Sequence, residues 1–428
     1  MVVQPATPDL RSNFRNLYAD IFWFGVLSGS TAAFLSVYAA RLGASSLQVG
    51  LLTAGPAMVN LLFSLPMART LETRPLIRSA FLSSIWQRLG YLLLIPLAWL
   101  FDPQQEIWAI LVIVLLMSIP GTVLAIAFNA LLADLVPPNW RAVVVGRRNA
   151  LVAVSMTATS LLCGQLLDRV AFPLNYQLVF GLGAAGALLS SYHLSRLRSP
   201  GSQPPARAGR PLGDVARPFL TRMADSLRPS AGLRFLTRAG GKPLLRLDLL
   251  RGPFGLFLAA YLIFYTFQYV PLPLFPLLYV RGLSLPDSAI SLGAALFQAT
   301  VTIVSLGLVN QGARFSHRSI LISGALLFGH YPLLLAFARD ATLFWVVSFT
   351  GGLVWALLGS GLINRLMERV PDDQRPAYMA LHNLALNLGI LIGSLLGPLL
   401  GDWMGLREAL LLSAGLRLLA GLFLLLWA

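Results

Sequence analysis

Charged residues are scarce in this chain: they make up 11% of its 428 residues, while hydrophobic residues make up 57%. A soluble domain usually carries about 25% charged residues. A chain of this length has no way to bury so much apolar side chain and still face water with its surface. The composition therefore excludes an ordinary water-soluble protein and indicates that lipid is the solvent for much of the chain.

Cysteine, histidine and lysine are also scarce. Cys163, the only cysteine, lies within an apolar run, which excludes an intramolecular disulfide and a thiolate-bound metal. The histidines are spread over different apolar segments, so they form no metal-ligand or catalytic spacing. The single lysine, Lys242, follows two glycines but lacks the GxxxxGK[ST] pattern of a phosphate-binding loop. We therefore predict no metal, no cofactor, no direct use of ATP and no enzymatic activity.

Long apolar runs dominate what remains. A helix needs roughly 20 apolar residues to cross a hydrocarbon layer of about 30 Å. Runs of that length predict an all-α membrane protein with twelve transmembrane helices, at 17–40, 47–67, 78–101, 106–133, 144–168, 173–195, 254–280, 287–311, 317–338, 341–367, 376–402 and 406–427.

The distribution of positive charge predicts an orientation. The net charge is +15, and most arginines fall on the side of the membrane that holds Arg11 and Arg15. Because cytoplasmic loops are enriched in Lys and Arg, both termini are predicted to be cytoplasmic, in an inner or plasma membrane. No basic stretch carries interleaved aromatics for base stacking, so nucleic acid is not expected as a partner. The opposite side carries only Arg41, Arg169, Arg281, Arg339 and Arg407.

An internal repeat divides the chain into two halves. Residues 134–168 align without a gap to 368–402, and Asp134, Pro137 and Arg141 match Glu368, Pro371 and Arg375. A weaker echo sets Arg41 against Arg281. Because each half holds six spans, the two halves enter the membrane in the same direction as a parallel repeat. We predict an N-terminal bundle over 1–195, a basic cytoplasmic linker over 196–251 and a C-terminal bundle over 252–428.

Three loop segments carry a resemblance to a known family. The segment 133–141 (ADLVPPNWR) and its repeat copy 368–375 are similar to the loops after helices 4 and 10 of the major facilitator superfamily (MFS) of secondary transporters, and 41–46 (RLGASS) looks like that family's entry into helix 2. The resemblance implies an MFS-type fold, in which the halves rock about a site near the midplane. The family's glycine-, aspartate- and arginine-rich signature between helices 2 and 3 is only partly kept here, at 65–74 (LPMARTLETR).

The predicted cytoplasmic loops hold the gating candidates. An acid at the end of helix 4 or helix 10, Asp134 or Glu368, is within reach of arginines on neighbouring loops, among them Arg69 and Arg74. Such pairs at the inner rim are expected to latch the outward-facing state. Arg141 and Arg375 are expected to hold their loops through carboxylates or helix-end carbonyls. The alternative is that all of these charges only set the topology.

Ionisable and aromatic residues inside the spans supply the substrate and coupling candidates. Ionisable groups in spans are costly and functional by default. Asp20 is the best single candidate, as a proton carrier or cation contact; the alternative is that it only caps the inner rim or pairs with Arg15. Arg88 and Arg417 are candidates for pairing within the protein, with substrate contact as the alternative. Tyr261, Tyr265 and Gln268 share one helix face at i, i+4, i+7 spacing, and the tenth helix adds Trp355 and Asn364.

These observations predict a function. An aromatic, weakly polar cavity suits a small neutral or amphipathic solute, so we expect a secondary active transporter that works by alternating access. The expected partners are that solute and the lipid bilayer around a monomer, with a coupling proton or Na⁺ left open. A transporter-like membrane sensor or scaffold without transport stays open as the alternative, because the loop signature is worn and acids are few within the spans.

Overall fold

The structure, a computed structural model, describes residues 8–72, 74–198, 246–311, 317–371 and 375–427. In the N-terminal half, residues 8–198, the helices are α1 (Pro8–Leu27), η1 (Ser28–Ala32), α2 (Ala33–Arg41), α3 (Ser46–Glu72), α4 (Leu76–Leu93), α5 (Leu97–Leu100), α6 (Pro103–Leu135), α7 (Pro138–Arg169) and α8 (Leu174–Ser195). Throughout the described ranges the regular elements are helices, as the composition predicts.

The C-terminal half, residues 246–427, repeats this order. Its helices are η2 (Leu247–Arg251), α11 (Pro253–Tyr269), α12 (Leu274–Leu277), η3 (Leu278–Gly282), α13 (Asp287–Gln311), α14 (His317–Leu327), α15 (His330–Phe337), α16 (Ala341–Arg369), α17 (Arg375–Met404) and α18 (Leu406–Trp427). Most of the predicted linker, 196–251, falls outside the described residues, and so do the side chains of Asn364 and Arg375.

Ten helices in the described ranges are long and apolar enough to cross a membrane. The other two predicted spans, 78–101 and 317–338, are also helical but interrupted. The first is split into α4 and α5 around Pro96, and the second is split into α14 and α15 at Phe328 and Gly329. The polytopic all-helical architecture is confirmed, while the full twelve spans are confirmed only if these two broken helices are counted.

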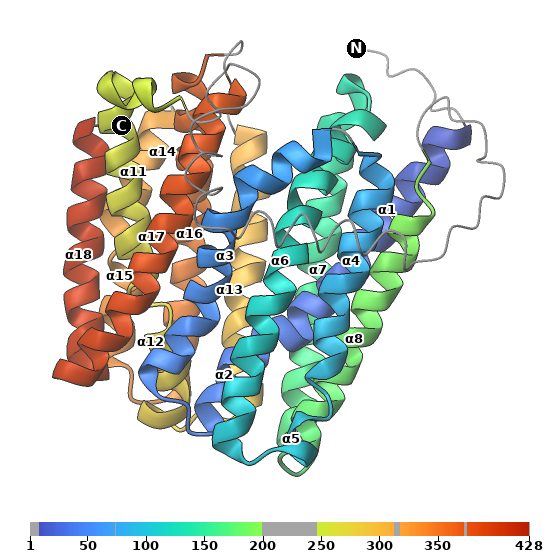
Figure 1. Ribbon diagram of the computed structural model, residues 1–428. Coiled ribbons are helices and arrows are strands. Elements are labelled where there is room, and N and C mark those ends of the chain that lie inside the picture. The colour runs from blue at the N-terminus through green and yellow to red at the C-terminus, as the bar shows by residue number, and fades with distance from the viewer. Residues whose placement is uncertain (1–7, 73, 199–245, 312–316, 372–374, 428) are drawn as a thin grey trace, which may run out of the picture.

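The two halves stand side by side (Figure 1). Their ribbons approach one another at the end that holds α2, α5 and α12, and they diverge at the end where α1 begins and α18 ends. Because the helices run back and forth between these ends, we name them by residues that lie there: the Arg41 end, with Arg41 and Asp287, and the termini end, with Asp134 and Glu368.

Glycines set how closely the halves approach. A Cβ on Gly50 of α3 would lie 2.5 Å from the carbonyl oxygen of Ser394 on α17, and a Cβ on Gly164 of α7 would lie 2.0 Å from the hydroxyl of Ser291 on α13. Real Cβ atoms do not come that close to another atom. The halves therefore meet along two helix pairs, α3 with α17 and α7 with α13, which are related by the internal repeat.

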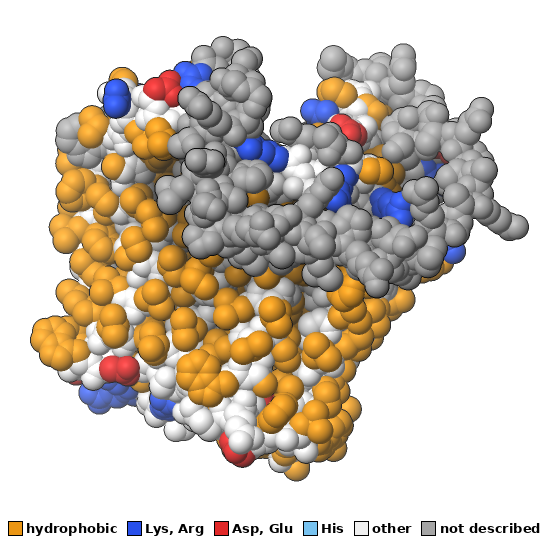
Figure 2. All heavy atoms as spheres, viewed as in Figure 1, with side chains coloured by type: hydrophobic (Ala, Val, Ile, Leu, Met, Phe, Trp, Pro, Cys, Tyr) orange, Lys and Arg blue, Asp and Glu red, His pale blue; other side chains and the backbone are white. Residues whose placement is uncertain are grey.

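The outer surface is apolar between two charged ends. Figure 2 shows hydrophobic side chains over most of the visible lower face, with charged side chains gathered at its two extremes. Large apolar side chains point outward from several helices, including Leu116, Leu162 and Ile303. Such a surface is unstable in water and matches a hydrocarbon surround.

Candidate functional site

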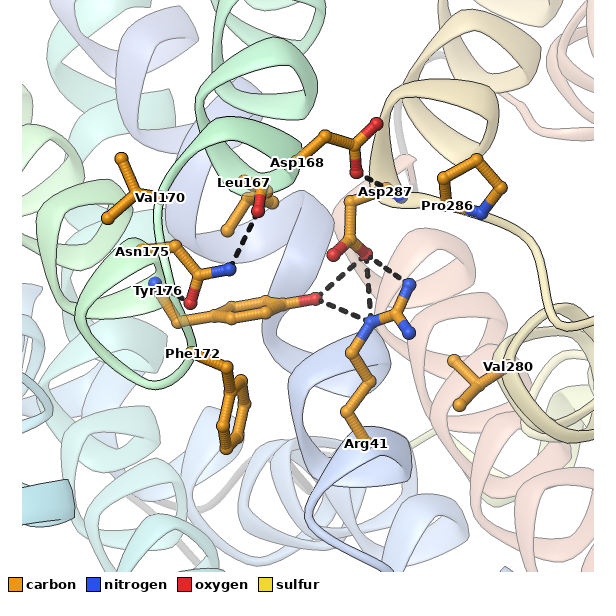
Figure 3. Close-up of a pocket in the computed structure, with 10 residues that line it drawn as sticks. All are labelled: Arg41, Leu167, Asp168, Val170, Phe172, Asn175, Tyr176, Val280, Pro286 and Asp287. Carbon is orange, nitrogen blue, oxygen red and sulfur yellow. Dashed lines mark hydrogen bonds and ion pairs between the residues drawn. The ribbon is translucent and has the colours of Figure 1, made fainter.

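The halves are joined at the Arg41 end by a charged cluster. Arg41, the last residue of α2, donates to Oδ1 of Asp287 from Nε at 3.1 Å and from Nη2 at 2.9 Å. Tyr176 of α8 donates its hydroxyl to the same carboxylate oxygen at 2.8 Å. Asp287 begins α13, so one carboxylate of the C-terminal half receives hydrogen bonds from two elements of the N-terminal half (Figure 3).

A second carboxylate crosses in the opposite direction. Asp168, near the end of α7, accepts the backbone N–H of Asp287 at 2.9 Å and that of Ser288 at 3.2 Å. These are among the first N–H groups of α13, which have no partner within their own helix. A carboxylate at a helix N-terminus is also favoured by the helix dipole. Asp168 therefore caps a helix of the other half, which ties the approach of α7 to that of α13.

Arg41 and Arg281, which the internal repeat matches to each other, each make a hydrogen bond to the opposite half. Arg41 donates to the carbonyl oxygen of Leu285 at 2.9 Å, and Arg281 donates to the carbonyl oxygen of Ala44. Each half thus sends an arginine to the loop that precedes the other half's next helix. The crossing explains the matched arginines in the sequence: they are contacts between the halves, related by the axis of the repeat.

A cavity of about 480 Å³ lies beside this cluster. Figure 3 shows Arg41 and Tyr176 pointing toward Asp287 from one side, while Asp168 approaches the start of α13 from above. Phe172 and Val280 give the cavity apolar walls. The charged groups that line the cavity are engaged with one another, so they hold the two halves together at this end.

At the termini end, Arg141 and Glu368 make contacts within their own half. Arg141 donates to the carbonyl oxygens of Val136 at 3.1 Å and Ala133 at 2.9 Å, so it holds the end of α6. Glu368 pairs with Arg365 of its own helix at 2.9 Å. Asp134 is exposed. Their gating role, with that of Arg69, Arg74 and Arg375, stays a prediction about the state in which this end closes.

Asp20 lies in a buried network inside the N-terminal half. Arg148 of α7 approaches Oδ2 of Asp20 at 3.3 Å, and the hydroxyl of Ser190 on α8 donates to Oδ1. Arg88 of α4 donates to Ser190 at 2.8 Å and also to the hydroxyl of Ser191. One carboxylate thus serves two arginines, directly and through a serine. The described partner of Asp20 is Arg148, which the sequence prediction did not name.

The aromatic candidates on α11 divide into two kinds. Tyr261 is buried and donates to the carbonyl oxygen of Leu362 on α16 at 2.8 Å, so it packs the C-terminal half. Tyr265 is partly exposed, and its hydroxyl lies 3.0 Å from Nε2 of His382 on α17. Trp355 packs against the buried hydrophobic cluster that contains Tyr261, and Gln268 is buried near the end of α11. Tyr265 is therefore the partly exposed tyrosine of the predicted face, and its contact with a solute stays a prediction.

A line of amide and hydroxyl groups crosses between the halves near the middle of the helices. Thr122 of α6 donates to Oδ1 of Asn60 on α3, and Asn60 donates to Oδ1 of Asn387 on α17 at 3.2 Å. Asn387 in turn donates to the backbone carbonyl of Asn383 at 2.8 Å. We call Thr122, Asn60, Asn387 and Asn383 the amide line.

Sequence reasoning missed Asn60 and Asn387 as site residues. An asparagine in the interior of a span costs free energy unless its amide is hydrogen-bonded, and that cost was a usable signal. The amide residues predicted as candidates were Gln268 and Asn364 instead. The pairing of α3 with α17 was also not visible in the sequence, and it is this pairing that brings the two asparagines together.

The geometry defines a class of protein: a helical membrane protein of two repeated bundles, closed at one end by contacts between the bundles and carrying polar groups at their midplane. The family model described as Major Facilitator Superfamily matches residues 21–309 and 257–428. Together these matches cover nearly the whole chain, and the chain belongs to this superfamily of transporters. It is accordingly a membrane transport protein rather than an enzyme.

Solved structures share this fold at low sequence identity. A mutant of the nucleoside transporter NupG aligns over 97% of this chain and 99% of its own, with 11% identity and a TM-score of 0.66. A bacterial homologue of the human lysosomal transporter Spinster, inward-facing and unoccupied, aligns over 99% and 98%, with 14% identity and a TM-score of 0.67. The xylose transporter XylE from E. coli aligns over 97% of both chains, with 13% identity and a TM-score of 0.66. A search of curated proteins finds no sequence match.

Proposed function

We propose that this chain is a secondary active transporter that moves a small neutral or amphipathic solute across the cytoplasmic membrane by alternating access. The observation that carries the proposal is the closure at the Arg41 end, where Arg41, Asp168 and Tyr176 of one half hold Asp287 of the other. At the termini end, Glu368 pairs within its own helix. With the termini in the cytoplasm, as the arginine distribution predicts, this is an inward-facing arrangement.

The solute class follows from the groups that lie between the halves. The amide line offers amide and hydroxyl groups, and the neighbouring pair of Tyr265 and His382 adds an aromatic wall. Asp20, a buried acid of the first span, is already held by Arg148. A neutral or amphipathic solute gains hydrogen bonds and apolar contact in such a site, whereas a strongly charged solute meets no counter-charge in the amide line.

Coupling follows from the same geometry. The carboxylate of Asp20 is engaged by the ion pair to Arg148 and by the hydrogen bond from Ser190. A coupling role for Asp20 therefore requires that Arg148 move away during the cycle. Without such a movement, Asp20 does not carry the coupling ion.

Solute counterflow in proteoliposomes, with and without a pH gradient, tests the proposal. We expect saturable uptake of at least one neutral solute in a panel of sugars, nucleosides and uncharged amphipathic compounds. Asn387→Ala and Asn383→Ala should raise KM. Asn149→Ala is the matched control, because Asn149 occupies the position of Asn383 in the first repeat and lies outside the amide line.

Two outcomes would contradict the proposal. If no solute exchanges although the protein is folded and reconstituted, the alternative of a transporter-like sensor or scaffold is favoured. If flux occurs but the Asn149 and Asn387 variants behave alike, the amide line is not the solute site.

A further inference from the structure

Arg417 is a buried cation with no acid beside it among the described residues. It lies near the middle of α18, and its exposed fraction is 5%. Within the described part of the C-terminal half the acidic residues all lie at helix ends: Asp248, Asp287, Asp340, Glu368, Asp402 and Glu408. A buried charge without compensation costs several kcal/mol, so something other than a carboxylate has to stabilise this guanidinium.

The guanidinium contacts both sides of the break in the seventh span. Nη2 of Arg417 donates to the backbone carbonyl of Gln268, near the last turn of α11, at 2.6 Å. Its central carbon also lies 6.0 Å from the ring centre of Phe275 in α12 and 4.6 Å from that of Phe328. α11 ends before the break and α12 begins after it, so one side chain joins the two segments.

The carbonyl of Gln268 is available because the helix is interrupted after it. Pro271 and Pro273 have no N–H, so they cannot supply the donors that a continuing helix would bring to the carbonyls of Phe267 and Tyr269. The donor for the carbonyl of Gln268 would be the N–H of Leu272, but α11 ends at Tyr269, before that residue. The next hydrogen bonds run instead from Leu274 and Phe275 to the carbonyl of Pro271, at 3.0 and 3.2 Å. The last carbonyls of α11 therefore lack their usual donors. They also carry the negative end of the helix dipole, which favours a cation there.

The break in the ninth span meets α18 in the same region. Phe328 and Gly329 separate α14 from α15, and a Cβ on Gly329 would lie 2.6 Å from the carbonyl oxygen of Ala414. Phe328 stacks its ring against the guanidinium. α18 thus packs tightly against the breaks in the seventh and ninth spans together.

The seventh span continues from its break to the closed end. After α12 it enters the π-helix η3, whose Arg281 donates to the carbonyl of Ala44 in the other half, and Asp287 begins the next helix. The angle between α11 and α12 therefore decides where Arg281 and Asp287 lie.

We propose that Arg417 is a positioning residue, which caps the broken end of α11 and fixes the angle between α11 and α12. In this way it keeps Arg281 and Asp287 in position for their contacts with the N-terminal half at the Arg41 end. The capping role stands on the contacts alone, while its effect on the gate rests on the proposed function.

A double-mutant cycle on thermal stability tests the cap without reference to transport. Arg417→Met keeps an apolar side chain of similar length but removes the donor and the charge, so it should lower the melting temperature. Replacing Pro271 and Pro273 by alanine lets α11 continue and supplies the Gln268 carbonyl with a backbone donor. In that background, Arg417→Met should lower the melting temperature by less than half as much as it does in the parent chain. An equal loss in both backgrounds would overturn the cap.

Arg407 provides a matched control on the same helix. It donates to the carbonyl of Ala336 near the end of α15 at 2.6 Å, but it is only partly buried and lies at the Arg41 end. Water can replace it there. Arg407→Met should therefore change the melting temperature much less than Arg417→Met, and a similar change in both would assign the effect to arginine loss in general.

Labelling of the gate tests the positioning role. Ala44 is fully buried at the contact between the halves, so a cysteine there, in a Cys163→Ala background, reacts with a membrane-impermeant maleimide only when the Arg41 end opens. Arg417→Met should raise that rate at a temperature where the variant is still folded, and Arg417→Gln, which retains a donor, should restore most of the slow rate. If the double-mutant cycle supports the cap but the labelling rate does not change, Arg417 caps α11 without affecting the gate, and the positioning role is overturned.

Discussion

Replacing Arg41 by glutamine removes the guanidinium that faces Asp287 at the closed end and leaves the rest of the gate in place. Nη2 of Arg41 lies 2.9 Å from Oδ1 of Asp287, and the exposed fractions of the two side chains are 25% and 7%. Since this pair joins the two halves, its loss acts on the balance between closed and open states. Glutamine retains a hydrogen-bond donor, so the change tests the charge.

The size of the effect follows from the geometry. Two unit charges about 4 Å apart attract by about 4 kcal/mol at an effective dielectric constant near 20. Because Arg41 is partly exposed, water screens the pair, and we expect about half of that, about 2 kcal/mol. With a tenfold change for every 1.4 kcal/mol, the open fraction should rise by about 30-fold.

Labelling at position 44 measures this change directly. In the Cys163→Ala, Ala44→Cys background, the maleimide rate should rise about 30-fold in Arg41→Gln, and a comparable rise should follow Asp287→Asn. Together the two substitutions should add little beyond either one, because they break the same pair. Arg169→Gln is the control, since Arg169 is exposed at the same end. The reasoning fails if the two single effects add in full, or if the Arg169 variant opens the gate as strongly.

Three further predictions concern the rest of the molecule. Asp20→Asn leaves Arg88 and Arg148 buried without their carboxylate, so the free energy of unfolding should fall by about 3–5 kcal/mol, measured as earlier unfolding in a detergent melt; a stability equal to that of the parent chain would contradict the network. Gly164→Leu forces α7 away from Ser291, so it should raise the labelling rate of a cysteine at position 44. Gly146→Leu is the control and should leave that rate unchanged, because a Cβ added at this glycine of the same helix meets no atom within 4 Å. Tyr265→Phe removes the hydroxyl that meets His382, so it should raise KM for a transported neutral solute in counterflow with little change in maximal rate; an unchanged KM would exclude that hydroxyl from the solute site.

Much of the fold was predictable from the sequence because a membrane span has a strong and local signal. A run such as the one that became α8 has to be about one bilayer long and apolar, and its predicted bounds, 173–195, nearly match Leu174–Ser195. The two interrupted spans were harder, since Pro96 and Gly329 break a helix without ending the apolar run. The composition predicts the span but not its interior break.

The site was less predictable because its groups come together through pairing between distant helices. Arg41 and Arg281 were recognised as matched, yet their crossing to Leu285 and Ala44 depends on how the halves face each other. The pairing of Arg148 with Asp20 joins two helices that are far apart in the chain, so it was likewise not visible in the sequence. A single sequence shows which residues are costly to bury, and only the packing shows which partner stabilises each of them.

Distances between the halves at both ends test alternating access most directly. One spin-label pair, at Gln104 and Arg339, reports on the Arg41 end, and a second pair, at Arg78 and Arg251, reports on the termini end; all four residues are exposed. Arg41→Gln should lengthen the distances of the first pair and shorten those of the second, because opening one end closes the other. If both pairs lengthen together, or if the second pair does not respond while the first does, the halves do not rock about a central site and the account is contradicted.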